Sequence, residues 1–218
     1  MSDYECESNE QTPTLSAKYL TAEDCNIAAS LLYQAYHDDL LFQQILNYKD
    51  VEPSAYEKKL RLLIREELAS FWKSHQHIVG VCQDDNLVAV SCILNLSSDL
   101  SANRVWHWRL KLMLNTGALS TKQLIDKETR IRESLSEYKN TCFISLFAVD
   151  PHMQHQGFGR YLLRAIDDIV KTEQASSSAI FVTQSTHKPL FESEGYTVLQ
   201  SLGFTKVSGE LLIKQNRQ

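Results

Sequence analysis

The chain has 218 residues, of which 43% are hydrophobic and 22% charged, a composition typical of a globular protein with a sizeable core. Its formal net charge of −5 argues against a nucleic-acid-binding protein, because such proteins need a basic surface. No run of about 18 apolar residues is present, and the N-terminus is acidic where a signal peptide would be basic and then apolar. We therefore expect a cytoplasmic protein without a membrane segment. The five cysteines include no Cys-x-x-Cys pair, so neither a disulfide framework nor a metal site is expected.

The first part of the chain predicts a tail, a strand and a helix. Residues 1–14 are polar and are expected to be unstructured, whereas residues 15–218 are expected to form one domain. A strand is predicted over residues 15–20. Residues 21–24 read Thr-x-x-Asp, a capping box, and apolar residues at helical spacing extend the helix that it opens to about residue 36.

A second helix and a hairpin are predicted next. The helix follows from an apolar stripe over residues 56–71, with a Ser-x-x-Glu capping box at residues 54–57. Charged residues beside the stripe, Glu67 among them, are expected to form a solvated face. Residues 77–82 and 87–94 are β-rich runs separated by a polar turn, which is the pattern of a hairpin.

The most informative stretch is residues 142–169. Residues 142–149 are apolar at nearly every position, which predicts a strand covered on both faces, and an Asp-Pro pair ends it. A Gln-x-x-Gly-x-Gly turn follows at residues 154–159, and from Phe158 the apolar residues recur every three or four positions, as on one face of a helix. A glycine-rich turn that opens a helix lets the backbone approach a ligand and presents unpaired N–H groups, an arrangement suited to a pyrophosphate.

This stretch resembles the acetyl-CoA-binding motif of the GNAT N-acetyltransferases, in which Arg/Gln-x-x-Gly-x-Gly/Ala follows a strand that ends Val-x-Pro. The glycine patterns of dinucleotide folds and of P-loops are both absent. The matching residues are Val149, Pro151, Gln154, Gly157 and Gly159. The resemblance implies an α/β (mixed α+β) fold: a central, mixed, mostly antiparallel twisted sheet of about six to seven strands, flanked by helices, with a helical insertion at about residues 97–140 before the central strand.

The resemblance also implies acetyl-CoA as the acyl donor. In the family, backbone N–H groups where the central strand bulges hold the thioester and the pantetheine, and the glycine-rich turn holds the pyrophosphate. Two interpretations of Arg160 remain open: its charge lies close to the pyrophosphate, or it is a surface residue in the first turn of the helix. The positions that match are Phe147, Ala148, Val149, Gln154, His155, Gln156, Gly157, Phe158, Gly159 and Arg160.

Residues 184–196 resemble the second motif of the family, in which an Asn after a strand leads into a helix that ends Tyr-Glu-x-x-Gly-Phe. Gln184 takes the place of the Asn, and Phe191 stands where the tyrosine usually is. That tyrosine is commonly assigned to protonating the departing CoA thiolate, and phenylalanine has no proton to give. The other donors that the sequence offers for this step are Tyr196, Ser145, Ser185 and water.

The general base that removes the proton of the amine is not fixed by the sequence. Asp38 and Asp39 follow the first helix, and His107 lies in the insertion. Of these, histidine alone needs no pKa shift to act near neutrality. Residues 35–42 are similar to an Ala-Phe-x-x-Asp-Pro-x-Phe stretch of the branch that includes puromycin N-acetyltransferase, with Leu40 in place of the proline.

The insertion bears on the acceptor. Residues 105–113 and 124–138 each predict a helix, and Trp106, His107 and Trp108 either cover an acceptor cleft or pack in the core. We expect an enzyme that transfers an acetyl group from acetyl-CoA to the primary amine of a small molecule by direct transfer. A protein or peptide N-acetyltransferase and a catalytically silent acyl-CoA-binding module remain alternatives. A homodimer is compatible with the family.

Overall fold

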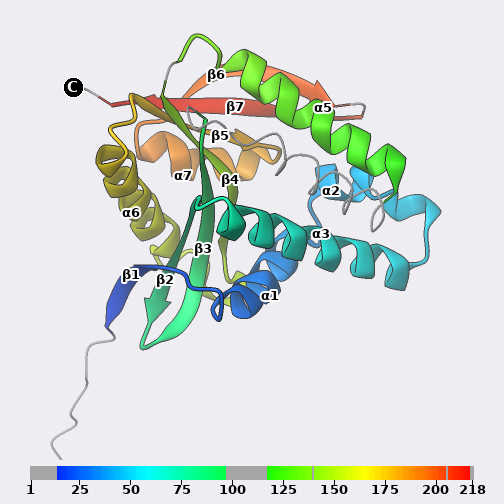
Figure 1. Ribbon diagram of the computed structural model, residues 1–218, viewed down its shortest axis with the longest axis horizontal. Coiled ribbons are helices and arrows are strands. Elements are labelled where there is room, and N and C mark those ends of the chain that lie inside the picture. The colour runs from blue at the N-terminus through cyan, green and yellow to red at the C-terminus, as the bar shows by residue number, and fades with distance from the viewer. Residues whose placement is uncertain (1–13, 97–116, 139, 205, 217–218) are drawn as a thin grey trace, which may run out of the picture.

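The computed structural model describes residues 14–96, 117–138, 140–204 and 206–216 (Figure 1). The predicted tail at residues 1–14 and the predicted helix at residues 105–113 therefore lie almost wholly or wholly outside the described residues. Short 3₁₀ helices are written η. The elements are β1 (Leu15–Tyr19), α1 (Cys25–Tyr36), α2 (Leu40–Ile45), η1 (Tyr48–Asp50), α3 (Pro53–Lys73), β2 (His77–Gln83), β3 (Asn86–Asn95), α5 (Ala118–Ser134), β4 (Thr141–Val149), η2 (Pro151–Met153), α6 (Phe158–Thr172), β5 (Ser177–Val182), η3 (Ser185–His187), α7 (Lys188–Ser193), β6 (Thr197–Phe204) and β7 (Val207–Gln215).

One sheet of seven strands organises the molecule, in the order β1-β2-β3-β4-β5-β7-β6. Only β4 and β5 run parallel, and every other neighbouring pair is antiparallel. The mixed, mostly antiparallel sheet predicted from the sequence is thereby confirmed. The predicted hairpin is confirmed as β2 and β3, joined by Asp84 and Asp85 with φ of 47° and 65°, the left-handed values that a tight hairpin turn requires.

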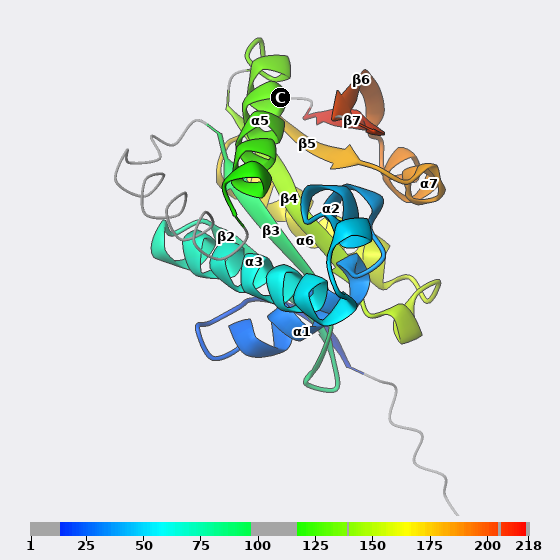
Figure 2. The same cartoon turned by 90° about the vertical axis from the view of Figure 1, so that its right-hand side faces the viewer.

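Helices cover both faces of the sheet. Figure 2 shows α3 and α5 in front of the sheet and α6 behind it. The first hydrophobic core joins α1, α2, α3 and α5 to one face, and the second joins α6 and α7 to the other. The apolar stripe predicted for the helix after the glycine-rich turn is the face of α6 that is buried in the second core: Phe158, Leu162, Ile166 and Ile169.

The sheet opens at β4. β4 pairs with β5 only from Thr141↔Ser177 to Ile144↔Ile180, and beyond that point β5 pairs with β7 alone. On the other edge of β4, Cys92 pairs with Leu146 and Ile93 with Ile144, so Ser145 is the extra residue of a β-bulge. A bulge bends its strand, and the second half of β4 therefore diverges from β5.

Several predicted boundaries are wrong because caps depend on their surroundings. No capping box forms at residues 54–57: α3 begins at Pro53, which suits the first helical position because it has no N–H to leave unpaired. In the box at residues 21–24, the Asp24 carboxylate accepts from the Thr21 N–H at 2.8 Å, but the Thr21 hydroxyl bonds that carboxylate instead of a helix amide. Helix α5 spans Ala118–Ser134 where residues 124–138 were predicted, and α2 was not predicted at all.

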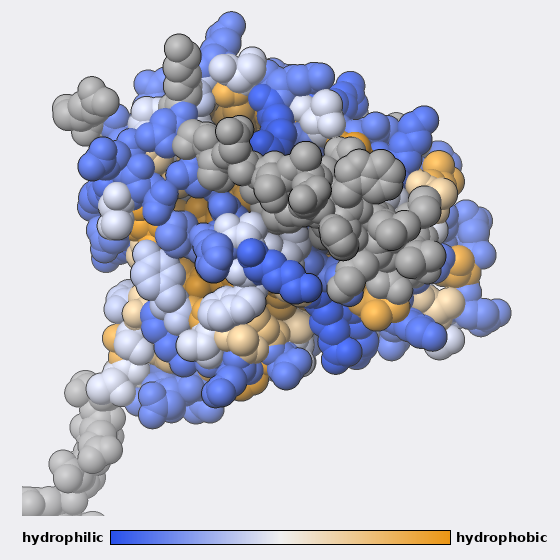
Figure 3. Space-filling view, viewed as in Figure 1, coloured by the Kyte–Doolittle hydropathy of each residue, from blue (hydrophilic) through white to orange (hydrophobic). Residues whose placement is uncertain are grey.

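The surface in Figure 3 is mostly hydrophilic, with hydrophobic residues visible in separate small areas. Among the helices described, none is long and apolar enough to cross a membrane.

Candidate active site

The turn before α6 has the geometry of an anion site. Gly157 caps the helix with φ of +91°, and a Cβ there would meet no heavy atom within 4 Å, so the glycine is required by its backbone conformation. The first helical hydrogen bond runs from the Tyr161 N–H to the Gly157 carbonyl at 3.0 Å. The N–H groups of residues 158–160 precede it, and the described part of the chain supplies no acceptor for them. These amides and the positive end of the helix dipole suit a pyrophosphate.

Gly159 serves a different purpose. A Cβ at this position would lie 3.0 Å from Leu190 Cδ2 and 3.6 Å from Val149 Cγ2. The second glycine of the motif thus allows α6 to approach α7 and the end of β4 closely. The turn and the divergent half of β4 are held together by this contact.

Two of the three predicted β4 residues face the gap between β4 and β5. The Asp150 N–H donates to the Val88 carbonyl at 2.8 Å, so Asp150 points toward β3. Peptide groups alternate along an antiparallel strand, and Ala148 therefore also points toward β3, where it pairs with Val90. The peptide groups of Phe147 and Val149 point the other way, into the gap. The Phe147 N–H is bonded to the Tyr36 hydroxyl, so the Val149 N–H is the one placed to face an acyl chain.

Tyr36 reaches the peptide group of Phe147, which the sequence did not predict. The hydroxyl of Tyr36, at the end of α1, accepts a hydrogen bond from the Phe147 N–H at 3.0 Å and donates one to the Phe147 carbonyl at 3.2 Å. Burial raises the pKa of Tyr36 above its ordinary value, so this phenol keeps its proton at neutral pH. A neutral hydroxyl is thus fixed at the strand end where the resemblance puts the thioester.

Phe191 lies beside the same strand end. Its ring contacts the ring of Phe147 edge to face, with centroids 5.3 Å apart, and it is 3% exposed. Tyr196 is equally buried, and its hydroxyl shares a hydrogen bond of 2.9 Å with Ser178 Oγ. Burial raises the pKa of Tyr196 as well. The Tyr196 hydroxyl is thus hydrogen-bonded within the second core, whereas the Tyr36 hydroxyl is hydrogen-bonded to the backbone of β4.

The predicted base candidates are mostly engaged elsewhere. Both oxygens of the Asp39 carboxylate are used: Oδ1 accepts from the amides of Leu41 and Phe42 at 3.0 Å, and Oδ2 accepts from the Thr183 hydroxyl at 2.8 Å. Asp39 is therefore the N-cap of α2 and ties it to the end of β5. Asp38 is exposed and pairs with His37 at 2.7 Å. His107 lies outside the described residues.

Arg160, predicted beside the pyrophosphate, extends over α7. Its Nε lies 2.9 Å from Glu194 Oε1, and its side chain is about half exposed. Gln154 donates weakly to the Val149 carbonyl at 3.4 Å. Gln154, His155 and Gln156 are exposed at the turn, as a surface for a bound cofactor requires. No cluster of metal-ligating side chains is found in the described ranges.

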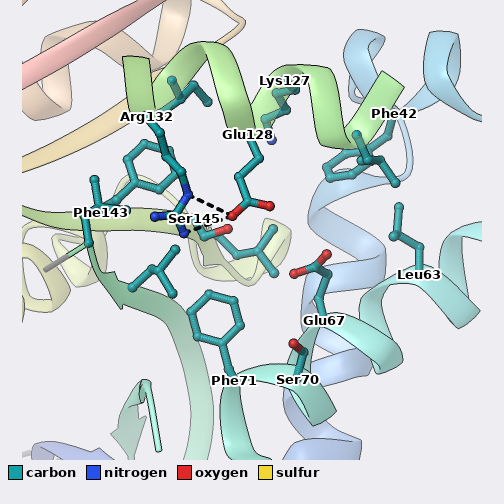
Figure 4. Close-up of a pocket in the computed structure, with 15 residues that line it drawn as sticks. Phe42, Leu63, Glu67, Ser70, Phe71, Lys127, Glu128, Arg132, Phe143 and Ser145 are labelled. Atoms are coloured by element: carbon teal, nitrogen blue, oxygen red, sulfur yellow. Dashed lines mark hydrogen bonds and ion pairs between the residues drawn. The ribbon is translucent and has the colours of Figure 1, made fainter. Parts of the chain in front are cut away.

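A cavity of about 100 Å³ lies on the other side of β4 from α6, between α3 and α5 (Figure 4). We call it the α3–α5 pocket. It reaches the bulge residue Ser145 and Leu146, and most of its walls are apolar. Three charged residues of α5, Lys127, Glu128 and Arg132, line one wall, and Glu67 of α3 lines the opposite one.

The prediction that Glu67 belongs to a solvated face is wrong. It lines the pocket because α5, about 60 positions further along the chain, lies opposite this side of α3. Across the pocket, Glu128 is held in an ion pair by Arg132, with Glu128 Oε1 at 3.0 Å from Nε and 2.9 Å from Nη2.

A strand pair that parts beside a glycine-rich turn, with a pocket across the bulged strand, is an architecture suited to an acyltransferase that uses acyl-CoA. The family model of the acetyltransferase (GNAT) family matches residues 42–192, which is more than half of the chain. The chain therefore belongs to the GNAT family and is an acetyltransferase. A search among curated protein sequences gave no significant match.

Solved structures share the fold at low sequence identity. A histone acetyltransferase HPA2-related acetyltransferase from Corynebacterium glutamicum is 13% identical with a TM-score of 0.66, over 95% of this chain and 98% of that one. A polyamine N-acetyltransferase from Drosophila melanogaster, which forms N-acetylagmatine, is 10% identical with a TM-score of 0.63, over 93% and 100%. The PaiA N-acetyltransferase from Thermoplasma acidophilum, solved with coenzyme A, is 12% identical with a TM-score of 0.58, over 93% and 99%. At these identities the likeness establishes the fold.

Proposed function

We propose that the chain transfers the acetyl group of acetyl-CoA directly to the primary amine of a small molecule. The observation that carries the proposal is the position of the β4 bulge, which separates the cofactor turn and strand gap from the α3–α5 pocket. An acyl group held in the gap and an amine held in the pocket would meet at this strand. Bringing two reactants together in this way supplies much of the catalysis in a direct transfer.

In the proposed arrangement, the pyrophosphate lies on the amides of the turn at residues 154–160, and the acyl chain follows the gap along Phe147 and Val149. Acetyl-CoA supplies the activated thioester. The amine nitrogen bonds to the thioester carbon, the carbon–sulfur bond breaks, and the nitrogen loses a proton as the thiolate gains one. A backbone N–H group that points at the oxygen of the thioester carbonyl would stabilise the negative charge that develops on this oxygen.

We assign the proton for the thiolate to Tyr36. Phe191 has none to give, and the Tyr196 hydroxyl is bonded to Ser178 in the second core. The hydroxyl of Tyr36 sits on the Phe147 peptide, and burial keeps it protonated. The phenolate that forms recovers a proton from the acylated nitrogen or from water, so the protons balance over one turnover.

The acceptor is proposed to be small because α5 encloses the pocket. The Ser120 hydroxyl of α5 donates to the Ile45 carbonyl at 2.7 Å, and this buried bond anchors the helix against α2. A cavity of about 100 Å³ takes one side chain more readily than a run of peptide. The Drosophila protein that shares this fold acts on a small molecule, which agrees with a small acceptor but does not identify its class.

A silent acyl-CoA-binding module is the second candidate, favoured by Phe191. The test is release of CoA thiol from acetyl-CoA by the purified protein, with a panel of amines, amino acids and short peptides, and with calorimetric binding of acetyl-CoA as the reference. Turnover with one class of amine supports the proposal. Binding without turnover would assign the chain to the silent class, and turnover with peptides alone would replace the small acceptor by a protein one.

A further inference from the structure

We propose that the acceptor carries a carboxylate as well as its amine, as an α-amino acid does, and that Lys127 in the α3–α5 pocket binds this carboxylate. The inference rests on the proposed function and narrows its substrate class. It starts from the charges on the two walls of the pocket.

Lys127 is placed in the pocket by the periodicity of α5. Leu124 and Ile131, three positions before it and four after it, are buried in the first core, so Lys127 lies on the inward face of the helix. Its Nζ lies 5.8 Å from the centre of the Phe42 ring. The side chain is drawn pointing from α5 toward the pocket in Figure 4.

The ammonium of Lys127 forms no hydrogen bond or ion pair with the residues that the structure describes. Desolvation lowers its pKa, while the charges of Glu67, Asp39 and Glu128 oppose this shift. Two of these carboxylates are bound to other groups: Glu128 to Arg132, and Asp39 to its helix amides and Thr183. A half-buried, unpaired ammonium is costly to keep, and a bound carboxylate would compensate it.

The rest of the pocket is compatible with this acceptor. Glu67 on α3 lines the pocket across from Lys127 and has an interaction partner of its own, so Lys127 is the charged lining residue that a ligand carboxylate would pair with. Apolar side chains lie between the two walls, and they suit an aliphatic or aromatic body: Leu63, Phe71, Leu94, Leu124 and Ile131. A polyamine or a simple alkylamine would leave Lys127 without a partner and would bring a second positive charge near it.

The test compares acceptors that differ only in the carboxylate, such as phenylalanine with phenethylamine, tryptophan with tryptamine, leucine with 3-methylbutylamine and arginine with agmatine. We expect kcat/KM to be at least about tenfold higher for the amino acid in the preferred pair, because only the amino acid can form a charge-assisted hydrogen bond with Lys127. Lys127→Met should lower kcat/KM for the amino acid more than for the matching amine and so remove this preference, and Lys127→Arg should keep part of it. Lys122→Met, on the exposed side of α5, is the matched control and should change neither.

A preference for the amine in every pair, or an equal loss on both members in Lys127→Met, would overturn the inference while leaving the acetyltransferase activity standing. If no amine is acetylated, the proposed function fails, and calorimetry with the same pairs in the presence of CoA still decides the inference. Binding of an amino acid that Lys127→Met abolishes supports it, and no Lys127-dependent binding overturns it.

Discussion

At the scale of single residues, the hydroxyl that the second motif lacks is found on another helix. Phe191 stands where the family usually has tyrosine, and Tyr36 stands where the similar stretch of the puromycin branch has phenylalanine. The structure places both beside Phe147, one by its ring contact and the other by hydrogen bonds to the backbone. In the proposed arrangement, the proton donor at this strand end is therefore on the α1 side instead of the α7 side.

Tyr36→Phe should therefore lower kcat by about 10²- to 10⁴-fold, the usual contribution of a general acid, with little change in acetyl-CoA affinity. It should also cost about 1–3 kcal/mol of unfolding free energy, because the Phe147 amide loses its acceptor. Tyr196→Phe is the matched control, since it removes a buried hydroxyl bonded to Ser178. Steady-state kinetics and urea unfolding of both variants decide the assignment. Normal turnover in Tyr36→Phe with loss in Tyr196→Phe would move the acid to Tyr196.

Gly157 in the turn before α6 supports a second prediction at the scale of single residues. Gly157→Glu places a bulky anion at the phosphate cradle, in a backbone conformation with φ of +91°. Both it and Gly117→Glu, at the N-cap of α5 with φ of +96°, should cost about 1–2 kcal/mol of stability, because both glycines have a positive φ and both sites are open. Only Gly157→Glu should abolish the rise in melting temperature caused by acetyl-CoA. An unchanged rise would place the pyrophosphate elsewhere.

At the scale of elements, the local sequence pattern is sufficient to predict a helix or strand whose conformation is determined by its own residues. The strand β4, the hairpin β2–β3 and the buried face of α6 follow from apolar runs and spacing that neighbours reinforce. Helix α2 was not predicted because its six residues are too few for a periodic pattern, although its cap, Asp39, is local. The position of Glu67 in the pocket could not be predicted from the sequence either, because it depends on where α5 packs. The contact of Tyr36 with Phe147 could not be predicted because it joins positions 111 residues apart.

The cap of α2 supports a prediction about a former base candidate. Asp39→Ala removes the acceptor of two helix amides and of Thr183, and should cost about 1–3 kcal/mol of unfolding free energy. If Asp39 acts only through this cap, the folded variant should retain the pH profile of kcat. Chemical unfolding and a pH–rate series measure the two effects separately. Loss of the acidic limb of the pH–rate profile, with stability intact, would restore Asp39 as the base.

At the scale of the whole molecule, different helices cover the two faces of the sheet. A cluster of polar side chains joins the C-terminal end of α6, on the second face, to β2 and β3. Glu173, the C-cap of α6, accepts hydrogen bonds at 2.9 Å from Asn95 of β3 through Oε2 and from His77 of β2 through Oε1. The bond from Asn95, and then that from His77, lowers the pKa of the Glu173 carboxyl. The ionised form is thus favoured by folding.

Since the folded pKa lies below the unfolded one, Glu173 adds stability above its ordinary pKa of 4.5, and this contribution is lost as the pH falls below that value. Glu173→Gln keeps the shape of the side chain but removes its titration, so the loss of stability between neutral pH and about pH 3 should be smaller than in the unchanged protein. Urea unfolding at a series of pH values measures both curves. Asp168→Asn, on the exposed surface of the same helix, is the control, because among the described residues its carboxylate contacts only Lys171. Parallel curves for the Glu173 variant and the unchanged protein would show that this cluster does not couple α6 to the sheet.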